Sequence, residues 1–344
     1  MQRRRLGKSG VAVSDICMGT MTFGEQCDEP LSHRIMDRAY DEGVDFFDAA
    51  EMYPVPPTAE KFGVTEQFVG NWLKTKPRES VVVASKITGP AHGWFVPPVR
   101  HGHTALDRRQ IMQAVEGSLQ RLQTDYIDLY QTHWPDHNAR YEDILDTLTL
   151  LVKQGKVRAI GCSNETCWGV MKGLRAAEQY GLTRYDTVQN SFSLLNRRCE
   201  SELAQVCRQE KLSLLAYSPL AGGVLTGKYR DEFPAGARFT SYQNGGERQQ
   251  MLCHRFLNDR SREATIQLQQ VADEAGLTLT AMSVAWSRQH DFVASTIVGA
   301  SSVEQLGENL AAKDLILDAD TLHRIDVVDQ AIPTPIREDG LRRL

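Results

Sequence analysis

The chain has 344 residues, enough for one large domain, and its 41% hydrophobic and 24% charged residues are typical of a globular protein. Its net charge of −5 argues against a nucleic-acid or anionic-membrane partner, and no apolar run approaches the roughly 20 residues of a membrane-spanning helix. The seven cysteines contain no Cys-x-x-Cys pair, which favours reduced thiols over a disulfide framework. We therefore expect a cytoplasmic protein without a secretory signal.

Short apolar runs recur along the chain, and each ends in small or polar residues. Before the first of them, the three arginines at 3–5 suit the solvated edge of an N-terminal β-hairpin. Apolar runs of this length, bounded by polar residues, predict buried strands. In chain order the eight runs cover residues 15–20, 44–50, 81–86, 127–133, 157–164, 186–191, 212–219 and 294–301.

Helical periodicity fills several of the segments between these runs. Asp107 is a candidate N-cap with Gln110 three residues later, and apolar residues at 111, 115, 119 and 122 share one helix face. Gly155 and Gly276 are candidates to end two other helices. The pattern predicts further helices at 144–152, 165–180, 197–211 and 261–275, and one around 318–330 in the C-terminal tail.

The alternation of strands and helices predicts a (β/α)8 TIM barrel of the α/β class. A βα unit takes about 30 residues, and most strand ends are spaced accordingly. The longest steps carry insertions at 87–106 and 221–260, expected as long loops on one face of the barrel. A doubly wound sheet is the alternative, but eight regular units without an opening Gly-x-Gly-x-x-Gly disfavour it. We expect one domain over 1–344, with the tail packed outside the barrel or across its bottom.

The predicted strand ends bring together four ionisable side chains: Asp48, Tyr53, Lys86 and His133. Active sites of such barrels lie at this end of the strands. A phenol has an ordinary pKa near 10, so a nearby ammonium is needed to make it a useful acid at neutral pH. Asp48 would supply the counter-charge of a buried Lys86, and His133 would hydrogen-bond a carbonyl oxygen. The pattern predicts proton donation to a carbonyl.

These residues resemble the catalytic tetrad of the aldo-keto reductase superfamily. The resemblance lies in DAAEMY at 48–53, ASK at 84–86 and YQTHWP at 130–135, and it extends over nearly the whole chain. EMYPVPP and VGNWL are similar to the Tas-type bacterial branch, and the cofactor segments are similar to those of potassium-channel β subunits. The resemblance implies that NADPH reduces an aldehyde or ketone, with Tyr53 as general acid and without a Rossmann fold.

The resemblance also assigns the cofactor contacts. Ser163, Asn164 and Gln189 would bind the nicotinamide carboxamide, and Tyr217 would stack under the nicotinamide ring. Segment 218–228 would wrap the pyrophosphate with backbone amides, because small residues let the backbone approach phosphate closely. The full expected set is Gly19, Thr20, Met21, Asp48, Ser163, Asn164, Gln189, Tyr217, Ser218, Pro219, Leu220, Ala221, Gly223, Leu225, Lys228, Arg238, Val298, Gly299, Ser301, Gln305, Glu308 and Asn309.

The adenosine end is assigned to 299–309. Ser301 and Gln305 would lie near the 2′-phosphate, with Glu308 and Asn309 on the adenine. The segment after Gly299 opens a helix, and a helix N-terminus favours anions.

Two other motifs are weaker. GGVLTGKY at 222–229 nearly matches a nucleotide-binding P-loop, but Tyr229 replaces the required Ser or Thr, so an ATPase is disfavoured. Histidines at 101, 103, 133 and 137 stand at ligand-like spacings, but no carboxylate or cysteine set completes a metal site. Trp94, Phe95 and Trp134 would instead line an aromatic pocket for an apolar carbonyl substrate beside Tyr53 and His133.

A regulatory protein is the contrasting functional class. An NADPH-binding, redox-sensing subunit would keep the fold and the tetrad but turn over slowly, and fold does not decide between the two. We expect a small-molecule carbonyl substrate and assign no oligomeric state.

Overall fold

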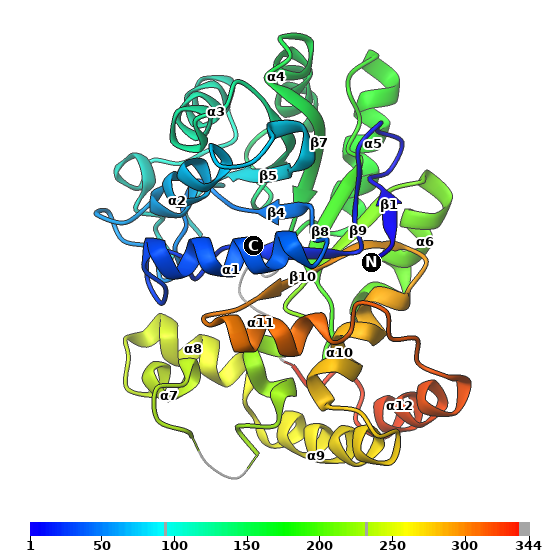
Figure 1. Ribbon diagram of the computed structural model, residues 1–344. Helices are drawn as coiled ribbons and strands as arrows, with labels where there is room; N and C mark the ends of the chain where they lie inside the picture. Colours follow the sequence, from blue (N-terminus) through cyan, green and yellow to red (C-terminus); the bar gives the residue numbers. More distant parts are fainter. Residues whose placement is uncertain (93–94, 231–232, 337–344) are drawn as a thin grey trace.

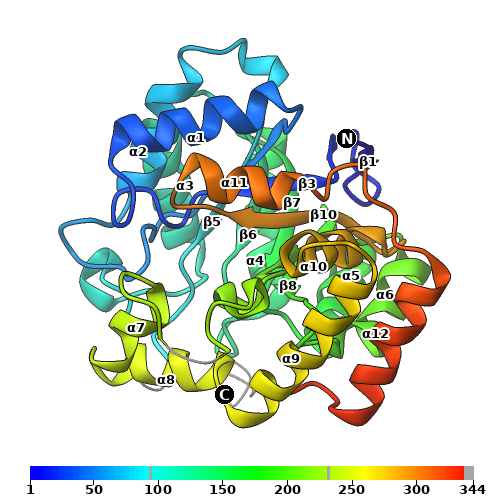
Figure 2. The ribbon, with the colours of Figure 1, turned by 60° about the horizontal axis from the view of Figure 1, so that its bottom comes forward.

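The computed structural model describes residues 1–92, 95–230 and 233–336. Over this part of the chain, parallel strands close into a barrel in the order β10-β3-β4-β5-β6-β7-β8-β9, with helices around it (Figures 1 and 2). Each predicted apolar run coincides with one barrel strand, so the (β/α)8 barrel is confirmed and the doubly wound alternative is excluded. The barrel strands are β3 (Ile16–Gly19), β4 (Phe46–Asp48), β5 (Val82–Ile87), β6 (Ile127–Thr132), β7 (Val157–Ser163), β8 (Thr187–Ser191), β9 (Ser213–Tyr217) and β10 (Val293–Gly299).

The helices predicted from periodicity are present. The Asp107 carboxylate accepts a hydrogen bond from the Gln110 amide at 2.9 Å and caps α3, and Gly155 and Gly276 follow the ends of α4 and α9. Helices α1, α2 and α10 lie in segments where the periodicity made no prediction. The helices outside the second insertion are α1 (Glu29–Asp41), α2 (Val64–Leu73), α3 (Arg108–Leu122), α4 (Tyr141–Lys153), α5 (Cys167–Tyr180), α6 (Glu202–Glu210), α9 (Asp259–Glu274), α10 (Leu279–Gln289), α11 (Val303–Leu310) and α12 (Ala319–Ala331).

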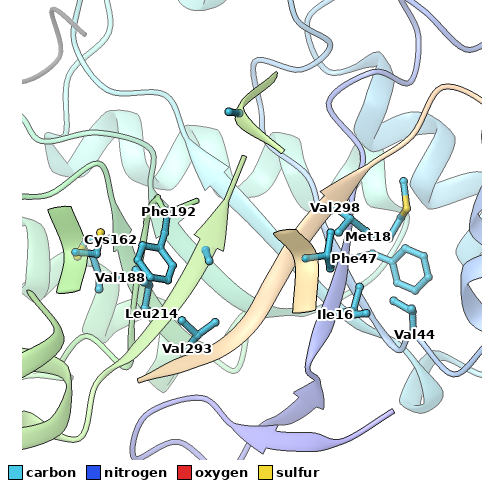
Figure 3. Close-up of a cluster of buried hydrophobic side chains, with 14 of the residues drawn as sticks. Ile16, Met18, Val44, Phe47, Cys162, Val188, Phe192, Leu214, Val293 and Val298 are labelled. Carbon is cyan, nitrogen blue, oxygen red and sulfur yellow. The ribbon is translucent and has the colours of Figure 1, made fainter. Parts of the chain in front are cut away.

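The strands are buried on both faces, which is why their sequences are nearly continuous apolar runs. Ile16 and Met18 of β3 point outward toward the helices with Phe47 (Figure 3), whereas Cys17 and Phe46 belong to a separate cluster inside the barrel. This alternation follows from the two-residue period of a strand.

The predicted N-terminal hairpin is present as β1 (Arg3–Arg5) and β2 (Ala12–Ser14), and it closes one end of the barrel. Leu6 and Val13 are buried in the cluster inside the barrel, and Arg4 donates to the Val293 carbonyl at 2.5 Å, where β10 begins. The active site is therefore expected at the opposite end, where the strands finish.

The second insertion carries more structure than the expected long loop. After the 3-10 turn η4 (Ala221–Thr226) it forms α7 (Arg238–Gln243) and α8 (Glu247–Phe256). The rings of Phe239 and Phe256 stack with centroids 5.7 Å apart, so the two helices pack on an aromatic core of their own. Both views show α7 and α8 on the side of the molecule away from the β1 hairpin (Figures 1 and 2).

The C-terminal tail packs outside the barrel, as expected. Helix α12 contacts α9, and Arg197 donates to Asp326 of α12 at 2.8 Å. Among the described residues, no helix is both long enough and apolar enough to cross a bilayer.

Candidate active site

The four residues of the predicted tetrad converge at the C-terminal mouth of the barrel. Parallel pairing sets Asp48 opposite Ala84, and Lys86 opposite Gln131. Because every second residue of a strand faces the interior, these polar side chains form a layer above the apolar interior. Tyr53 reaches the layer from the loop after β4, and His133 from the residue after β6.

Lys86 and Asp48 form a buried ion pair. The Lys86 ammonium donates to Asp48 Oδ2 at 2.5 Å and to the Ala49 carbonyl at 2.8 Å, and the two side chains are 0% and 4% exposed. Burial disfavours a charged lysine, but Asp48 and Tyr53 together raise the pKa of Lys86 above its ordinary value. Lys86 is therefore a cation at neutral pH, and it lies 4.9 Å from the centre of the Tyr53 ring.

The pKa of Tyr53 differs from the sequence expectation. Burial raises the pKa of this phenol above its ordinary value, and the opposing effect of Lys86 does not offset it. The expected acidification by Lys86 is thus one contribution, but desolvation is the larger one. At neutral pH the phenol keeps its proton, which is the state that a general acid requires.

His133 is a neutral imidazole beside Tyr53. The two rings meet edge to face, with centroids 5.6 Å apart. Burial and the Lys86 charge lower the pKa of His133 well below its ordinary value. A neutral ring donates one hydrogen bond without adding charge, and its buried Nδ1 has no hydrogen-bond partner among the described residues.

Asp48 is held by two amides as well as by Lys86. The side-chain nitrogens of Gln189 and Gln131 donate to Asp48 Oδ1 at 2.9 and 3.4 Å. Gln189 was predicted from the sequence, whereas Gln131 was not. The signal was present, because Gln131 lies on β6 two residues before His133, and residues two apart in extended chain share one direction.

The residues assigned to the nicotinamide form one hydrogen-bond network with the tetrad. Tyr217 donates from its hydroxyl to Asn164 Oδ1 at 2.7 Å. Asn164, with φ +56°, donates to the His133 carbonyl at 2.9 Å, and Ser163 donates to the Gln189 carbonyl at 2.8 Å. The structure thus brings these four predicted residues together at the ends of β7, β8 and β9.

The turn after β9 brings the backbone of several small residues into left-handed conformations. Ser218, Ala221, Gly222 and Gly223 all have left-handed backbone angles, with φ between +50° and +99°. The amides of Ala221 and Gly223 donate to the carbonyls of Ser218 and Leu220 at 2.9 and 2.8 Å, so these two amides stabilise the turn itself. The predicted Pro219, Leu220 and Leu225 lie in the same turn.

Two cations accompany this turn. The Lys228 ammonium lies against Gly223, where a Cβ atom would be 3.4 Å from Nζ. Partial burial and the charge of Arg238 lower the pKa of Lys228, while Glu308 opposes the shift. Arg238 and Glu308 are therefore its electrostatic neighbours, and the two cations, Lys228 and Arg238, have the charge that suits the phosphates of a dinucleotide.

Helix α11 begins next to the end of β10, where Val298 and Gly299 lie. Gln305 accepts from both the amide and the hydroxyl of Ser301 at 3.0 Å, and Asn309 donates to the Gly299 carbonyl at 3.1 Å.

The remaining predicted cofactor residues follow β3, which pairs with β10 and β4. Gly19 lies opposite Gly299 and Asp48 in the two pairings. Thr20 precedes Met21 and donates from its hydroxyl to the Asp48 carbonyl at 2.9 Å.

Tyr53 belongs to a small buried apolar cluster at the barrel mouth. Phe95 and Trp134 belong to one buried cluster with Tyr53, and their own ring centroids are 6.0 Å apart. Trp94, the third predicted aromatic, lies outside the described residues. Within the described chain, no group of three or more His, Cys, Asp or Glu side chains is arranged to hold a metal ion.

Comparisons with known proteins agree with this geometry. Residues 15–330 match the model of the aldo/keto reductase family. The chain is 41% identical to "Protein tas" of Escherichia coli (strain K12) and of Shigella flexneri, over 97% of this chain and 99% of each relative. It is 33% identical to "Uncharacterized oxidoreductase YrpG" of Bacillus subtilis (strain 168), over 95% of both chains.

Proposed function

The chain belongs to the aldo/keto reductase family, and from this premise we propose that it reduces aldehydes or ketones with NADPH, using Tyr53 as the general acid. Membership makes it an oxidoreductase. The observation that carries the finer proposal is the buried Lys86–Asp48 pair beside Tyr53 at the barrel mouth.

In this mechanism the chain binds the carbonyl oxygen between Tyr53 and His133. Neutral His133 donates a hydrogen bond that orients the oxygen, and Tyr53 transfers its proton as negative charge develops there. The Lys86 cation then stabilises the phenolate of Tyr53. When bound, the reduced nicotinamide supplies a hydride to the carbonyl carbon. Proton donation by a positioned acid contributes about 10²–10⁴-fold to the rate.

The cofactor is proposed to lie along the ends of β7, β8, β9 and β10. Ser163, Asn164 and Gln189 would hold the carboxamide over Tyr217. The left-handed turn and Lys228 would hold the pyrophosphate, because small residues let the backbone approach a phosphate closely and a cation attracts a polyanion. The adenosine end is assigned to residues further along the chain: Arg238, Ser301, Gln305, Glu308 and Asn309.

Turnover tests the proposal against the redox-sensing alternative. A panel of aldehydes and ketones, with loss of NADPH absorbance as the readout, should give steady-state rates on at least one compound. Tight NADPH binding without such turnover would favour the regulatory subunit instead. We further propose a cytoplasmic location, supported by the seven free cysteines, and small carbonyl compounds as partners instead of nucleic acids or membranes.

A further inference from the structure

An arginine of the first insertion is buried against the catalytic loop. Arg100 lies in the 3-10 turn η2 (Val99–Gly102), and its guanidinium contacts both carboxylate oxygens of Glu51. Glu51 stands between Asp48 and Tyr53 in the chain. The side chains of Arg100 and Glu51 are only 11% and 4% exposed. A forked pair at this depth is specific in geometry, and loss of one partner leaves a buried charge.

The same arginine is tied to the surrounding backbone. Its Nε donates to Gln110 Oε1 at 3.0 Å, and the same oxygen accepts from the Ala105 amide at 3.0 Å. Glu51 in turn accepts from the Thr88 amide at 3.0 Å. The pair therefore joins the catalytic loop, both ends of the insertion and the first turn of α3.

The backbone at the pair is strained. Arg100 and His101 have φ of +50° and +54°, in the left-handed region that non-glycine residues rarely occupy. Such conformations persist only where surrounding contacts over-determine them. The Glu51–Arg100 ion pair is one such contact at the turn.

The anchored segment carries the apolar wall of the site. Val99 precedes Arg100 directly, and Val99 and Phe95 belong to the buried cluster that contains Tyr53 and Trp134. A turn fixed at Arg100 therefore fixes the position of this wall relative to the catalytic phenol.

We propose that Glu51 and Arg100 are positioning residues that hold the apolar wall against Tyr53 and thereby set the preference for bulky apolar carbonyl compounds over small ones. The inference rests on the proposed reductase function. A bulky substrate gains contacts from the wall, whereas a small aldehyde needs only Tyr53 and His133. Loss of well-placed contacts in an apolar pocket changes the ratio of kcat/KM between a bulky and a small substrate by about 10-fold or more.

The test compares Arg100→Met with wild type on 4-nitrobenzaldehyde and on propanal. We expect KM for the aromatic aldehyde to rise about 10-fold or more, with kcat/KM for propanal changed about 3-fold or less. Arg100→Lys keeps the charge without the fork and should restore part of the preference. Arg108→Met is the matched control, because Arg108 makes an exposed pair with Asp146 on the neighbouring helices and should leave both substrates unaffected.

A second measurement does not depend on turnover. Amide hydrogen exchange over residues 95–105 should be faster in Arg100→Met than in wild type, with exchange in the barrel strands unchanged. Equal loss of kcat/KM on both aldehydes, or unchanged exchange, would overturn the inference. If Arg100→Met does not fold, Arg100→Lys takes its place in both the aldehyde kinetics and the hydrogen-exchange measurement. If wild type reduces no carbonyl compound, the proposed function fails and so does the preference, while exchange still decides whether the pair anchors the insertion.

Discussion

The ammonium nitrogen of Lys86 lies 2.5 Å from a carboxylate oxygen of Asp48, and both side chains are buried. Asp48 also accepts hydrogen bonds from the side-chain amides of Gln189 and Gln131, so three side chains stabilise its negative charge. The one ammonium thus serves two groups, as the partner of Asp48 and as the nearest cation to Tyr53. Stability and catalysis are coupled at this residue.

The first prediction concerns stability at this pair. Lys86→Met leaves the Asp48 carboxylate buried without its cation, and breaking a buried pair in this way costs about 3–5 kcal/mol. The double variant Lys86→Met/Asp48→Asn removes both charges and should be more stable than Lys86→Met alone. Urea unfolding of wild type, Lys86→Met, Asp48→Asn and the double variant measures the effect. Simple additivity of the two single changes would contradict it.

The second prediction concerns the acid. Tyr53→Phe should lower kcat by about 10²–10⁴-fold and leave the NADPH dissociation constant within a few-fold, because only proton donation is lost. Tyr180→Phe, at an exposed tyrosine on α5, is the control and should behave as wild type. The assignment fails if Tyr53→Phe keeps more than half of kcat while chemistry limits the rate.

The barrel and the tetrad were predictable because they depend on patterns that are local in the chain. A buried strand appears as a short apolar run, and the ends of parallel strands meet at one mouth. Once the barrel is recognised, Asp48, Lys86 and His133 must therefore converge. Glu51 and Arg100 were not predictable in this way, since neither local sequence indicates a partner 49 residues away.

Two other features depend on the complete fold. Helices α7 and α8 are stabilised by packing of Phe239 on Phe256, which weak helical periodicity in the insertion did not reveal. The raised pKa of Tyr53 depends on how completely the folded chain around the phenol excludes water, which local sequence does not reveal, whereas the charge of Lys86 is evident from the sequence.

The third prediction concerns pH. Burial and Lys86 hold the pKa of His133 well below its ordinary value of 6.5, which the residue regains in the unfolded chain. As the pH falls below 6.5, the unfolded state binds a proton that the folded state does not bind, so folding loses stability. At pH 5.5 the unfolded pKa of 6.5 limits this loss to at most about 1.4 kcal/mol. His133→Gln removes the contribution.

Urea unfolding at pH 7.5 and 5.5 measures this effect. Between pH 7.5 and pH 5.5, wild type should lose more of its unfolding free energy than His133→Gln, by up to that limit. His323→Gln replaces an exposed histidine on α12 and should follow wild type. An equal loss in wild type and His133→Gln would contradict a neutral, buried His133.

The fourth prediction separates two roles of Tyr217. Its hydroxyl donates to Asn164 at 2.7 Å, and its ring is assigned to the nicotinamide. Tyr217→Phe should keep the stacking and lose only the hydrogen bond, which should weaken NADPH binding by about 0.5–1.5 kcal/mol. Tyr217→Ala should weaken it by a further 0.5–1.5 kcal/mol or so beyond the lost apolar area. Fluorescence titration measures both constants, and an unchanged constant in Tyr217→Ala would reject the stacking role.

The last prediction concerns the choice of cofactor. The chain is net negative, so a preference for the extra 2′-phosphate of NADPH needs local donors and cations. Arg238 and Lys228 are electrostatic neighbours, and Glu308 of α11 lies near Lys228, which places the cations between the left-handed turn and the adenosine segment. A charge-assisted hydrogen bond contributes about 1.5–3 kcal/mol. Arg238→Ala should therefore weaken NADPH binding by about 10-fold or more and NADH binding much less. Added salt should reduce the difference between the wild-type affinities for the two cofactors, because it screens the phosphate charge.

Dissociation constants for both cofactors at low and high salt decide the placement. Arg230→Ala is the matched control, because Arg230 is exposed in the same loop and donates to the Gly227 carbonyl, so it should affect NADPH and NADH alike. If Arg238→Ala weakens the binding of NADPH and NADH equally, Arg238 would be assigned to the pyrophosphate, because both cofactors contain that group. A wild type that binds NADH more tightly than NADPH would reject the NADPH assignment itself, since the 2′-phosphate would then contribute repulsion from Glu308 and no net attraction.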